Sequence, residues 1–363
     1  MRSRAAGLLL GVLADAAFGD PRRGHPVAGF GTVAAALERR VYADGRLAGA
    51  GYTALLVGAA AGLGLLAETA GRRRPVLGAA LTGAATWAVL GGASLAGHGA
   101  ALARELGAGP SPAHRGPVGP GPDLAAARRR LPSLCGRDPE SLDAAGMARA
   151  GVESLAENTS DAVVAPLFWG AVAGVPGLLG YRAVNTLDAM VGYRSPRYRR
   201  FGWAAARLDD AANLVPARVC AALCTVLAPA VGGSPSDAVA AWRRDAGGHP
   251  SPNAGPVEAA AAGALGVGLG GRTVYAHGVE ERPRLGSGPP PTPDDLHRAA
   301  RLSRLVGAAA AAVLAVAVAA RNGPRTPRRP LSGRAGPRRP RRTGRGAGRS
   351  GRAGRGAAAA PGG

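Results

Sequence analysis

Asparagine, carboxylate and histidine side chains are concentrated in a few short polar segments of this 363-residue chain, which is otherwise rich in Ala, Leu, Val and Gly. The chain contains five Asn, none before residue 158, and half of its aromatic residues fall within residues 168–203. Four Asn lie in the segments Glu157–Asp161, Asn185–Asp188, Asp209–Asn213 and His249–Asn253. Because these groups bind cations, phosphates and amides, we expect the chemistry of the protein in these segments.

Three carboxylates, Glu153, Glu157 and Asp161, recur at positions i, i+4 and i+8 of a segment that has no Gly or Pro between residues 152 and 165. This spacing places them on one face of a helix, where like charges repel. A solvated helix face is one interpretation. Beside a long apolar run, a cation or substrate site is favoured, because carboxylates at the level of a membrane are costly without a function.

Two further pairs have helical spacing. Asn185 and Asp188 are three residues apart, and so are Arg207 and Asp210, with Asp209 beside them. Such pairs are compatible with ordinary hydrogen bonds within one helix and with a substrate site.

Cationic and histidine side chains complete the set of candidates. The segment 193–200 holds four Arg, among them Arg194, and two Tyr. This composition suits a phosphate, because Arg presents a planar fork of donors, and it also suits a membrane anchor. His25 and His249 each precede Pro in polar segments, where either could act as a general base or as a loop hydrogen-bonding group.

Long apolar runs are the elements that must position these groups. Three runs of about 20 residues have no charged side chain: Leu47–Ala67, Val76–Gly97 and Ala162–Tyr181. Val219–Ser236 and Leu305–Ala320 are shorter but are flanked by Arg. The pattern predicts an all-α, polytopic integral membrane protein with about five apolar helices and polar helical connections, the first two helices forming a hairpin.

The polar connections must converge if they form one site. Residues 182–211 and 237–304 carry most of the candidates, so not every apolar run can cross the membrane fully. Val219–Ser236 contains Pro229 and is the run that we expect to be broken or only partly inserted.

The formal charge of +22 is concentrated at one end of the chain. Residues 321–363 contain 13 Arg and no Asp or Glu, and their Arg/Gly/Pro composition predicts a disordered tail after a membrane domain at 1–320. A nucleic-acid-binding function would rest on this tail alone, so we expect no specific nucleic acid as a partner. The absence of Lys excludes a Walker-type phosphate loop.

Six segments, taken in order, closely resemble the CobD/CbiB family, and the resemblance covers roughly residues 5–320. The segments are Gly19–Val27, Glu153–Pro166, Tyr181–Arg194, Phe201–Asp210, Asn213–Arg218 and His249–Gly255. The family is an integral-membrane enzyme of cobalamin biosynthesis, adenosylcobinamide-phosphate synthase. The resemblance implies ATP-dependent amide formation between a carboxylate of adenosylcobyric acid and the amine of aminopropanol phosphate.

This reaction gives the candidate residues expected roles. A carboxylate must be activated before an amine attacks it, and phosphorylation by ATP requires Mg²⁺ and phosphate-binding cations. We assign metal binding to Glu157, Asp161 and Asp188, and general base chemistry to His249, with Asp209 and Asp210 as further catalytic carboxylates. The expected substrate-binding residues are Arg194 and Arg207 for phosphates, Asn185 and Asn253 for amides, and His25. The implied location is the cell membrane, in contact with lipid, with the active site facing the cytoplasm.

A transporter of a small anionic substrate is the main alternative, because several spans with polar groups also build a substrate pathway. It would require polar residues within the spans and an internal repeat. The runs are almost purely apolar and no repeat is evident, so the enzyme is favoured.

Overall fold

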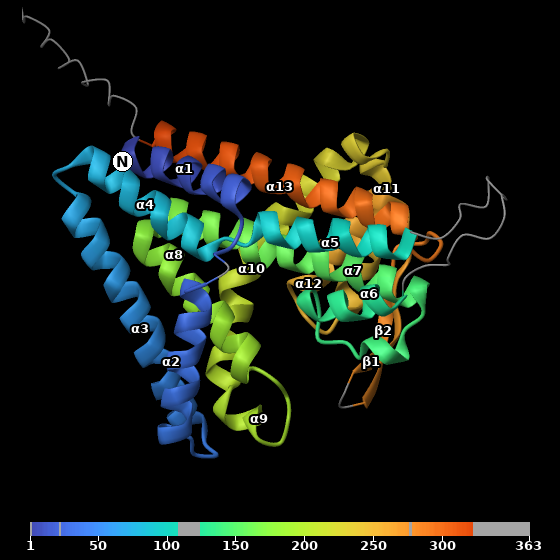
Figure 1. The fold of residues 1–363 in the computed structure, drawn as a ribbon, viewed down its shortest axis with the longest axis horizontal. Coiled ribbons are helices and arrows are strands. Elements are labelled where there is room, and N and C mark those ends of the chain that lie inside the picture. The colour runs from blue at the N-terminus through green and yellow to red at the C-terminus, as the bar shows by residue number, and fades with distance from the viewer. Residues whose placement is uncertain (1, 22, 108–123, 276–277, 322–363) are drawn as a thin grey trace, which may run out of the picture. The chain divides into compact units, whose positions relative to one another are not determined.

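Helices form nearly all of the described chain in the computed structural model (Figure 1). The structure describes residues 2–21, 23–107, 124–275 and 278–321, so the predicted tail lies outside the described residues apart from Arg321. The first helices are α1 (Arg2–Phe18), α2 (Pro26–Val41), α3 (Arg46–Gly71), α4 (Pro75–Val89), α5 (Gly92–Gly107) and α6 (Leu124–Arg130). They are followed by α7 (Ala144–Thr159), α8 (Ala165–Val191), α9 (Tyr198–Phe201), α10 (Trp203–Leu227), α11 (Pro235–Asp245), α12 (Ala254–Leu265) and α13 (Pro293–Ala320).

Within the described residues, five helical segments are long and apolar enough to cross a membrane. They are Arg46–Gly71, Pro75–Gly107, Ala144–Val191, Trp203–Val231 and Pro293–Ala320. Each contains one predicted run, apart from the last residues of the fourth, and the turn at Arg72–Arg74 joins α3 to α4 as a hairpin. The all-α, multi-span fold predicted from the apolar runs is therefore confirmed.

The fourth apolar run is broken as predicted, and a further break that was not predicted from the sequence lies at Gly174 of α8, in the third run. Gly174 has φ 71° and ψ −149°, and Pro176 follows it. Pro lacks the N–H that would bond the preceding turn, so carbonyl groups are left without their helical partners. Arg4 supplies donors to the carbonyl oxygens of Ala171 and Val172 and pairs with Glu68 of α3 at 2.7 Å. In the fourth run the helix ends at Leu227, and a short 3₁₀ turn spans Ala228–Val231.

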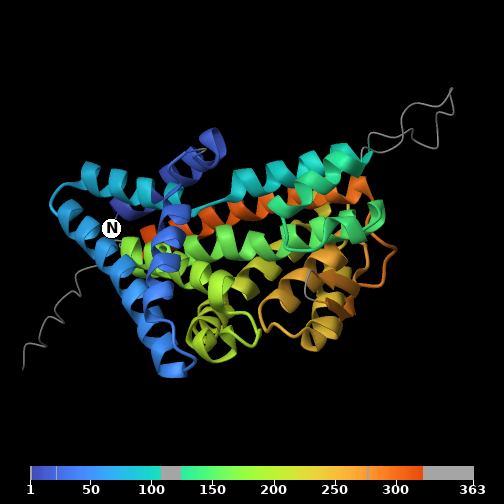
Figure 2. The same cartoon turned by 60° about the horizontal axis from the view of Figure 1, so that its bottom comes forward.

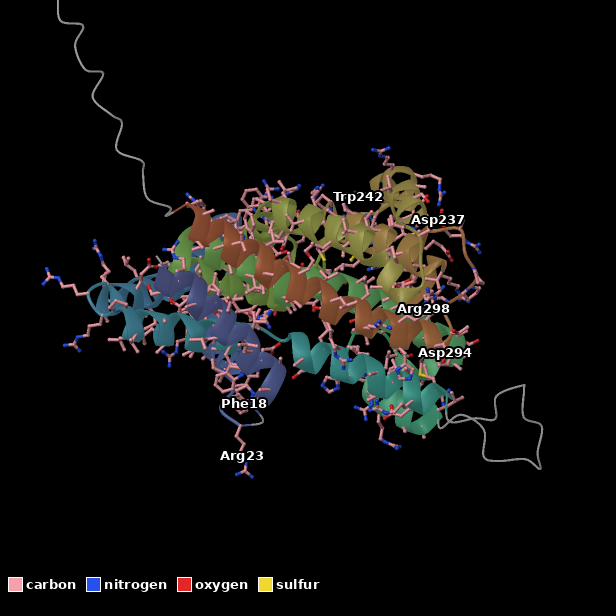
Figure 3. The ribbon with its side chains drawn as sticks, turned by 90° about the horizontal axis from the view of Figure 1, so that it is seen from above. Phe18, Arg23, Asp237, Trp242, Asp294 and Arg298 are labelled. Atoms are coloured by element: carbon pink, nitrogen blue, oxygen red, sulfur yellow. The ribbon has the colours of Figure 1, made fainter. Side chains whose placement is uncertain are left out.

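Small residues let the long helices pack closely. A Cβ added at Gly64 of α3 would lie 2.7 Å from the Pro176 backbone of α8, and one at Gly49 would collide with the Phe201 carbonyl. The opposite face of α3 exposes large apolar side chains, which suits contact with lipid. Large exposed apolar residues of α1 and α3 are Leu9, Leu10, Leu13, Phe18, Leu47, Leu55, Leu63, Leu65 and Leu66, and Figure 3 shows Phe18 at the margin of the helices.

α7 and α8 run end to end between the other helices (Figure 2). α13 packs along α5, α7 and α10 on one side of them. Arg298, labelled in Figure 3, lies on this helix. The Arg298 side chain donates to the carbonyl oxygens of Val231 at 2.8 Å and Leu265 at 2.9 Å, and pairs with Asp295. These carbonyls belong to the C-terminal ends of the fourth apolar segment and of α12, where positive charge is favourable.

One β-hairpin departs from the expected helical connections. Strands β1 (Leu269–Tyr275) and β2 (Gly278–Leu285) pair antiparallel, with Leu269 opposite Leu285 and an irregularity between Leu269 and Gly271. The hairpin lies beside α12 and follows its Gly-rich C-terminal end. It adds two strands to a fold that remains helical.

Candidate active site

Three of the polar segments meet at Asn185 of α8. Its amide nitrogen donates to Asp161 Oδ2 at 3.4 Å and to Asp209 Oδ1 at 3.3 Å. Asp161 lies in the segment between α7 and α8, and Asp209 lies in α10. Asp161 and Asp209, which lie 24 residues before and 24 residues after Asn185, therefore both accept from its side-chain amide.

Tyr181 and Asn213 form further hydrogen bonds to Asp161 and Asp209, the two aspartates that contact Asn185. The Tyr181 hydroxyl lies 2.8 Å from Asn213 Oδ1 and 3.1 Å from the carbonyl oxygen of Asp161. Asn213 in turn donates to Asp209 Oδ2 at 3.0 Å. Tyr181 and Asn213 are both buried, so their bonds hold the two aspartates in place while the carboxylates remain partly exposed.

A π-helical turn, Ser160–Val164, sets the direction of Asp161. Such a turn adds a residue to the helical period, and it often occurs at functional sites. The predicted face of Glu153, Glu157 and Asp161 is thereby divided. Glu153 pairs with the buried Arg137, while Asp161 accepts from the side-chain amide of Asn185.

Two more carboxylates face the same centre. Asp188 interacts electrostatically with Asp209, Asp210 and Glu157, and Asp161 interacts with Asp209, Glu157 and Asp188. The Glu157 side chain is exposed and interacts electrostatically with Arg282, Glu153 and Arg137. We call Glu157, Asp161, Asp188 and Asp209 the acidic cluster.

The acidic cluster fits Mg²⁺ by the chemistry of its donors. Carboxylate oxygens are hard ligands, and Mg²⁺ commonly keeps several waters while taking one or two carboxylates and the phosphates of a substrate. In the described part of the chain, no three His, Cys, Asp or Glu side chains are placed to hold a metal by themselves. The cluster therefore offers carboxylates to a hydrated ion rather than a closed protein cage.

A second group of polar side chains, which we call the second polar layer, interacts with Glu157 of the acidic cluster and includes Glu153 and Glu258. Glu153 forms a buried ion pair with Arg137, and its Oε1 accepts from the Gly270 amide of β1 at 2.7 Å. Glu258 of α12 interacts electrostatically with Glu157 and Glu153. Sequence reasoning missed Glu258 and Arg137 as site residues. A signal for Glu258 is present, because it is the only charged residue within Ala254–Leu265.

His249 belongs to this second layer. Its Nδ1 lies 3.1 Å from the Ser251 amide nitrogen and 3.3 Å from the Ser251 carbonyl oxygen, and its Nε2 faces Glu258 Oε1 at 3.9 Å. Burial lowers the pKa of His249, while burial and the nearby Glu157 and Glu153 raise the pKa of Glu258 well above its usual value. The ring has no open approach from solvent in this arrangement, since 3% of its side-chain surface is exposed.

Asn253 ties the segment after His249 to α10. Its Nδ2 donates to the Asp210 carbonyl at 2.8 Å, and Arg218 donates to its Oδ1 at 3.0 Å. Arg207 lies 3.8 Å from Asp210 Oδ2 and is 70% exposed, so its guanidinium is accessible to an anion.

Two predicted substrate-binding residues lie apart from these bonds. Arg194 is exposed, and no hydrogen bond or ion pair among the described residues joins it to the acidic cluster. His25 caps α2 through its Nδ1, which accepts from the Val27 amide at 3.2 Å, and its Nε2 lies 3.9 Å from Asp20. The structure thus brings together Glu157, Asp161, Asn185, Asp188 and Asp209, with Asp210, Asn253 and Arg207 at one edge.

Comparison with known proteins covers most of the chain. Residues 8–303 match the profile of the family described as CobD/Cbib protein. The chain is 58% identical over 306 residues to "Cobalamin biosynthesis protein CobD" of Mycobacterium tuberculosis (strain ATCC 25618 / H37Rv), covering 84% of this chain and 93% of that protein. Proteins of the same name from Chromobacterium violaceum and Rhodobacter capsulatus are 44% and 41% identical, covering 81% and 83% of this chain and 90% and 93% of their own lengths. No solved structure matches the chain.

Proposed function

The chain belongs to the CobD/CbiB family, and we propose that it acts in cobalamin biosynthesis as an ATP-dependent amide-forming ligase. Its substrates would be adenosylcobyric acid and aminopropanol phosphate, and its product adenosylcobinamide phosphate. The observation that carries the proposal is the family match over residues 8–303, which includes every segment that contributes to the acidic cluster.

The reaction needs two linked displacements. An oxygen of the substrate carboxylate attacks the γ-phosphorus of ATP, and ADP leaves, so that the carboxylate becomes an acyl phosphate. The amine nitrogen then attacks the acyl carbon, phosphate leaves and the nitrogen loses a proton. The protein must position the reactants and neutralise charge, which are the main contributions of proteins to phosphoryl transfer.

The acidic cluster suits this chemistry. One or two of the carboxylates of Glu157, Asp161 and Asp188 would hold a hydrated Mg²⁺, which when bound neutralises charge on the phosphates. Arg207 and Arg194 are exposed cations that suit phosphate groups. Asn185 and Asn253 are engaged with protein groups, so any contact with substrate amides would use their remaining hydrogen-bonding capacity.

The amine proton requires an acceptor near the acidic cluster. Asp209 is partly exposed, and its oxygens accept from two neutral amides, those of Asn185 and Asn213. We assign the proton to the Asp209 carboxylate. His249, the acceptor expected from the sequence, would hold Ser251 and face Glu258 instead.

The five apolar segments are consistent with a multi-pass membrane protein. We propose the cell membrane as its location, with the acidic cluster facing the cytoplasm, where ATP and the corrinoid are found. Cysteine labelling of residues 182–211 and 237–304 tests this orientation. Labelling of the two segments from opposite sides of the membrane would reject it.

The direct test is an assay of purified protein in detergent. Adenosylcobyric acid, aminopropanol phosphate, ATP and Mg²⁺ should give the amide together with ADP and phosphate in equal amounts. Omission of the amine should abolish the amide. Absence of the product, combined with uptake of a small anion into vesicles that contain the protein, would favour the transporter.

A further inference from the structure

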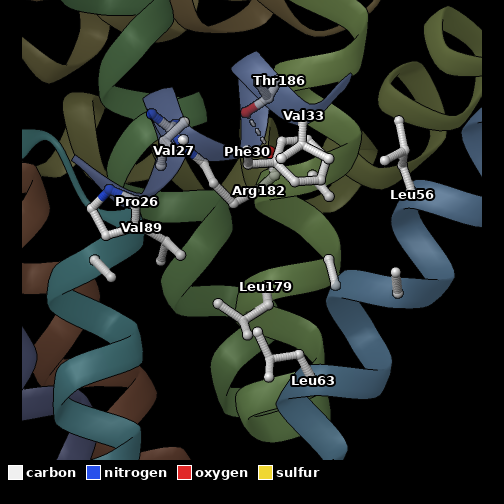
Figure 4. A pocket seen from close by; sticks show the side chains of 15 residues that line it. Pro26, Val27, Phe30, Val33, Leu56, Leu63, Val89, Leu179, Arg182 and Thr186 are labelled. Atoms are coloured by element: carbon white, nitrogen blue, oxygen red, sulfur yellow. Dashed lines mark hydrogen bonds between the residues drawn. The ribbon is translucent and has the colours of Figure 1, made fainter. Parts of the chain in front are cut away.

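An apolar cavity of about 340 Å³ lies between α2, α3, α4 and α8. Its walls include Val27 and Phe30 of α2, Leu63 of α3, Val89 of α4 and Leu179 of α8 (Figure 4). Arg182 of α8 is the only charged residue in the lining. A positive charge therefore lies against a cavity whose walls are otherwise almost entirely apolar.

The Arg182 guanidinium has little compensation from the protein. Its Nε is shielded from solvent and has no hydrogen-bond partner in the described part of the chain, and its Nη1 makes one long bond, 3.4 Å, to Asn185 Oδ1. Among the described residues, no carboxylate lies within 4 Å of it, although Asp20 and Asp161 act on it from farther away. Arginine stays protonated in proteins, so this charge calls for an anion at short range.

Three other arginines among the described residues, all partly or fully shielded from solvent, pair with a carboxylate. Arg4 pairs with Glu68 at 2.7 Å, Arg298 pairs with Asp295 at 2.6 Å, and Arg137 pairs with Glu153. Arg182 differs from these three because, among the described residues, no carboxylate lies within 4 Å of it and its side chain lines a cavity. Arg149, whose Nε also lacks a partner in the described part of the chain, instead donates to the carbonyl oxygens of Gly270 and Arg272. This contrast favours a bound anion over a purely structural role.

The other polar side chain of the cavity does not compete for a ligand. The Thr186 hydroxyl donates to the carbonyl oxygen of Arg182 at 2.7 Å, within the same helix (Figure 4). The cavity thus combines one cationic fork with apolar walls. A ligand that fits both would carry a carboxylate or phosphate on an apolar body.

Arg182, which lines the cavity, is linked to the acidic cluster by its bond to Asn185. Arg182 donates to the Asn185 oxygen, while the Asn185 nitrogen donates to Asp161 and Asp209. An anion held by Arg182 would therefore lie next to the residues that we assign to Mg²⁺ and to the amine proton. In the proposed reaction, the substrate carboxylate lies near these same residues.

We propose that Arg182 binds the corrinoid carboxylate that becomes the amide and that the apolar walls hold the methyl-bearing edge of the corrinoid next to it. The inference rests on the proposed function and adds a subsite to it. A cavity of 340 Å³ takes this edge alone, and the rest of the macrocycle lies outside it. Arg182 is thereby a substrate-binding residue that selects the acid over neutral corrinoids.

The test is equilibrium binding without ATP, using the purified full chain in nanodiscs of zwitterionic phospholipid. Two probes are compared: adenosylcobyric acid and its analogue with a primary amide in place of the reacting carboxylate. The parent should bind the acid roughly 10- to 100-fold more tightly than the amide, as expected for a charge-assisted contact. Arg182→Gln should remove this preference by weakening the acid and leaving the amide unchanged.

Two further variants guard the interpretation. Arg72→Gln removes an exposed charge from the turn between α3 and α4 and should keep the parental preference. Ala59→Leu fills the cavity from an exposed position and should weaken the acid and the amide equally. If Arg182→Gln does not fold, loss of both probes in Ala59→Leu still supports the cavity, and parental affinity in that variant overturns the proposal.

Several outcomes would overturn the inference. These are parental affinity for the acid in Arg182→Gln, equal weakening of acid and amide in that variant, or a parent that binds no corrinoid. Competition by anionic phospholipid that disappears in Arg182→Gln would assign the site to a lipid headgroup instead. If the parent prefers the acid but forms no amide with ATP, the proposed ligase fails while the Arg182 subsite stands.

Discussion

His249 Nε2 and Glu258 Oε1 face each other at 3.9 Å, and the two side chains expose 3% and 2% of their surfaces. Neither atom has a hydrogen-bond partner within residues 2–21, 23–107, 124–275 and 278–321. Glu157, Glu153, Arg282 and Arg137 also act on Glu258. Because burial raises the pKa of Glu258, this carboxyl keeps its proton in the folded protein at pH values where an unfolded chain releases it.

This difference predicts how Glu258→Gln changes stability with pH. Above pH 4.5 the folded state binds the Glu258 proton and the unfolded state does not, so the parent loses stability as pH rises toward the folded pKa. The loss is at most about 1.4 kcal/mol per pH unit for one group. Gln has no such proton, so the apparent Tm of Glu258→Gln relative to the parent should rise between pH 5 and pH 8.5. A constant difference would contradict a protonated Glu258.

His249 predicts the opposite dependence at lower pH. Burial lowers its pKa, so below pH 6.5 the unfolded state takes up a proton before the folded state does, and stability falls as pH falls toward the folded pKa. His249→Asn should reduce this dependence in thermal unfolding between pH 7 and pH 5. An unchanged slope would mean that the His249 ring is not held neutral.

Amide variants of the acidic cluster should lose activity while the protein still inserts and purifies. Glu157→Gln and Asp161→Asn remove charge that Mg²⁺ needs, so we expect ATP-dependent amide formation to fall about 100-fold or more, with little rescue by added Mg²⁺. Glu140→Gln, at an exposed position, is the matched control. Near-parental turnover in both cluster variants would show that Glu157 and Asp161 belong to a solvated helix face. The metal site would then be assigned to Asp188, Asp209 and Asp210.

The proton acceptor can be distinguished by a pair of variants. Asp209→Asn should lower the rate of amine attack about 100-fold in single-turnover measurements, because it removes the accepting carboxylate. His249→Asn should lower this rate much less, since the buried ring has no open path to the amine. Equal losses of the rate of amine attack in the two variants would favour His249 as the general base.

Close packing of α3 on α8 predicts different effects of two glycines in one helix. Gly64→Ala adds a Cβ 2.7 Å from the Pro176 backbone, so we expect a loss of about 1–3 kcal/mol and a lower apparent Tm. Gly62→Ala meets nothing within 4 Å and should be neutral or slightly stabilising. Equal Tm values for the two variants would show that α3 and α8 are not packed in this way.

Ending the chain at Ala320 tests the Arg-rich segment 321–363. α13 and its contacts with α5, α7 and α10 are complete at this residue. We therefore expect the shortened protein to form the amide at the parental rate and to restore growth of a cobamide-deficient strain. Loss of rescue at a normal protein level would show that the segment has a function.

The sequence alone determined the membrane architecture, because the hydrocarbon core imposes a local requirement on composition. Runs such as Leu47–Ala67 and Val76–Gly97 must be apolar along their whole length, so they are visible without knowledge of their neighbours. The polar segments around Glu157, Asn185 and Asp209 were visible for the same reason, since they interrupt a uniform background. The sharp break at Gly174 was not visible in the sequence, because the chain contains many Gly and Pro residues and packing decides which of them bends a helix.

Only the tertiary structure decided which polar groups meet. Asn185 reaches Asp161 and Asp209 because α8 packs beside the π-helical turn and α10. Likewise, Glu258 lies opposite His249 and near Glu157 because α12 docks against α7. Local spacing places side chains on a helical face, but it carries no information about the element that covers this face. Proximity across helices depends on how they dock, and docking is set by the whole core.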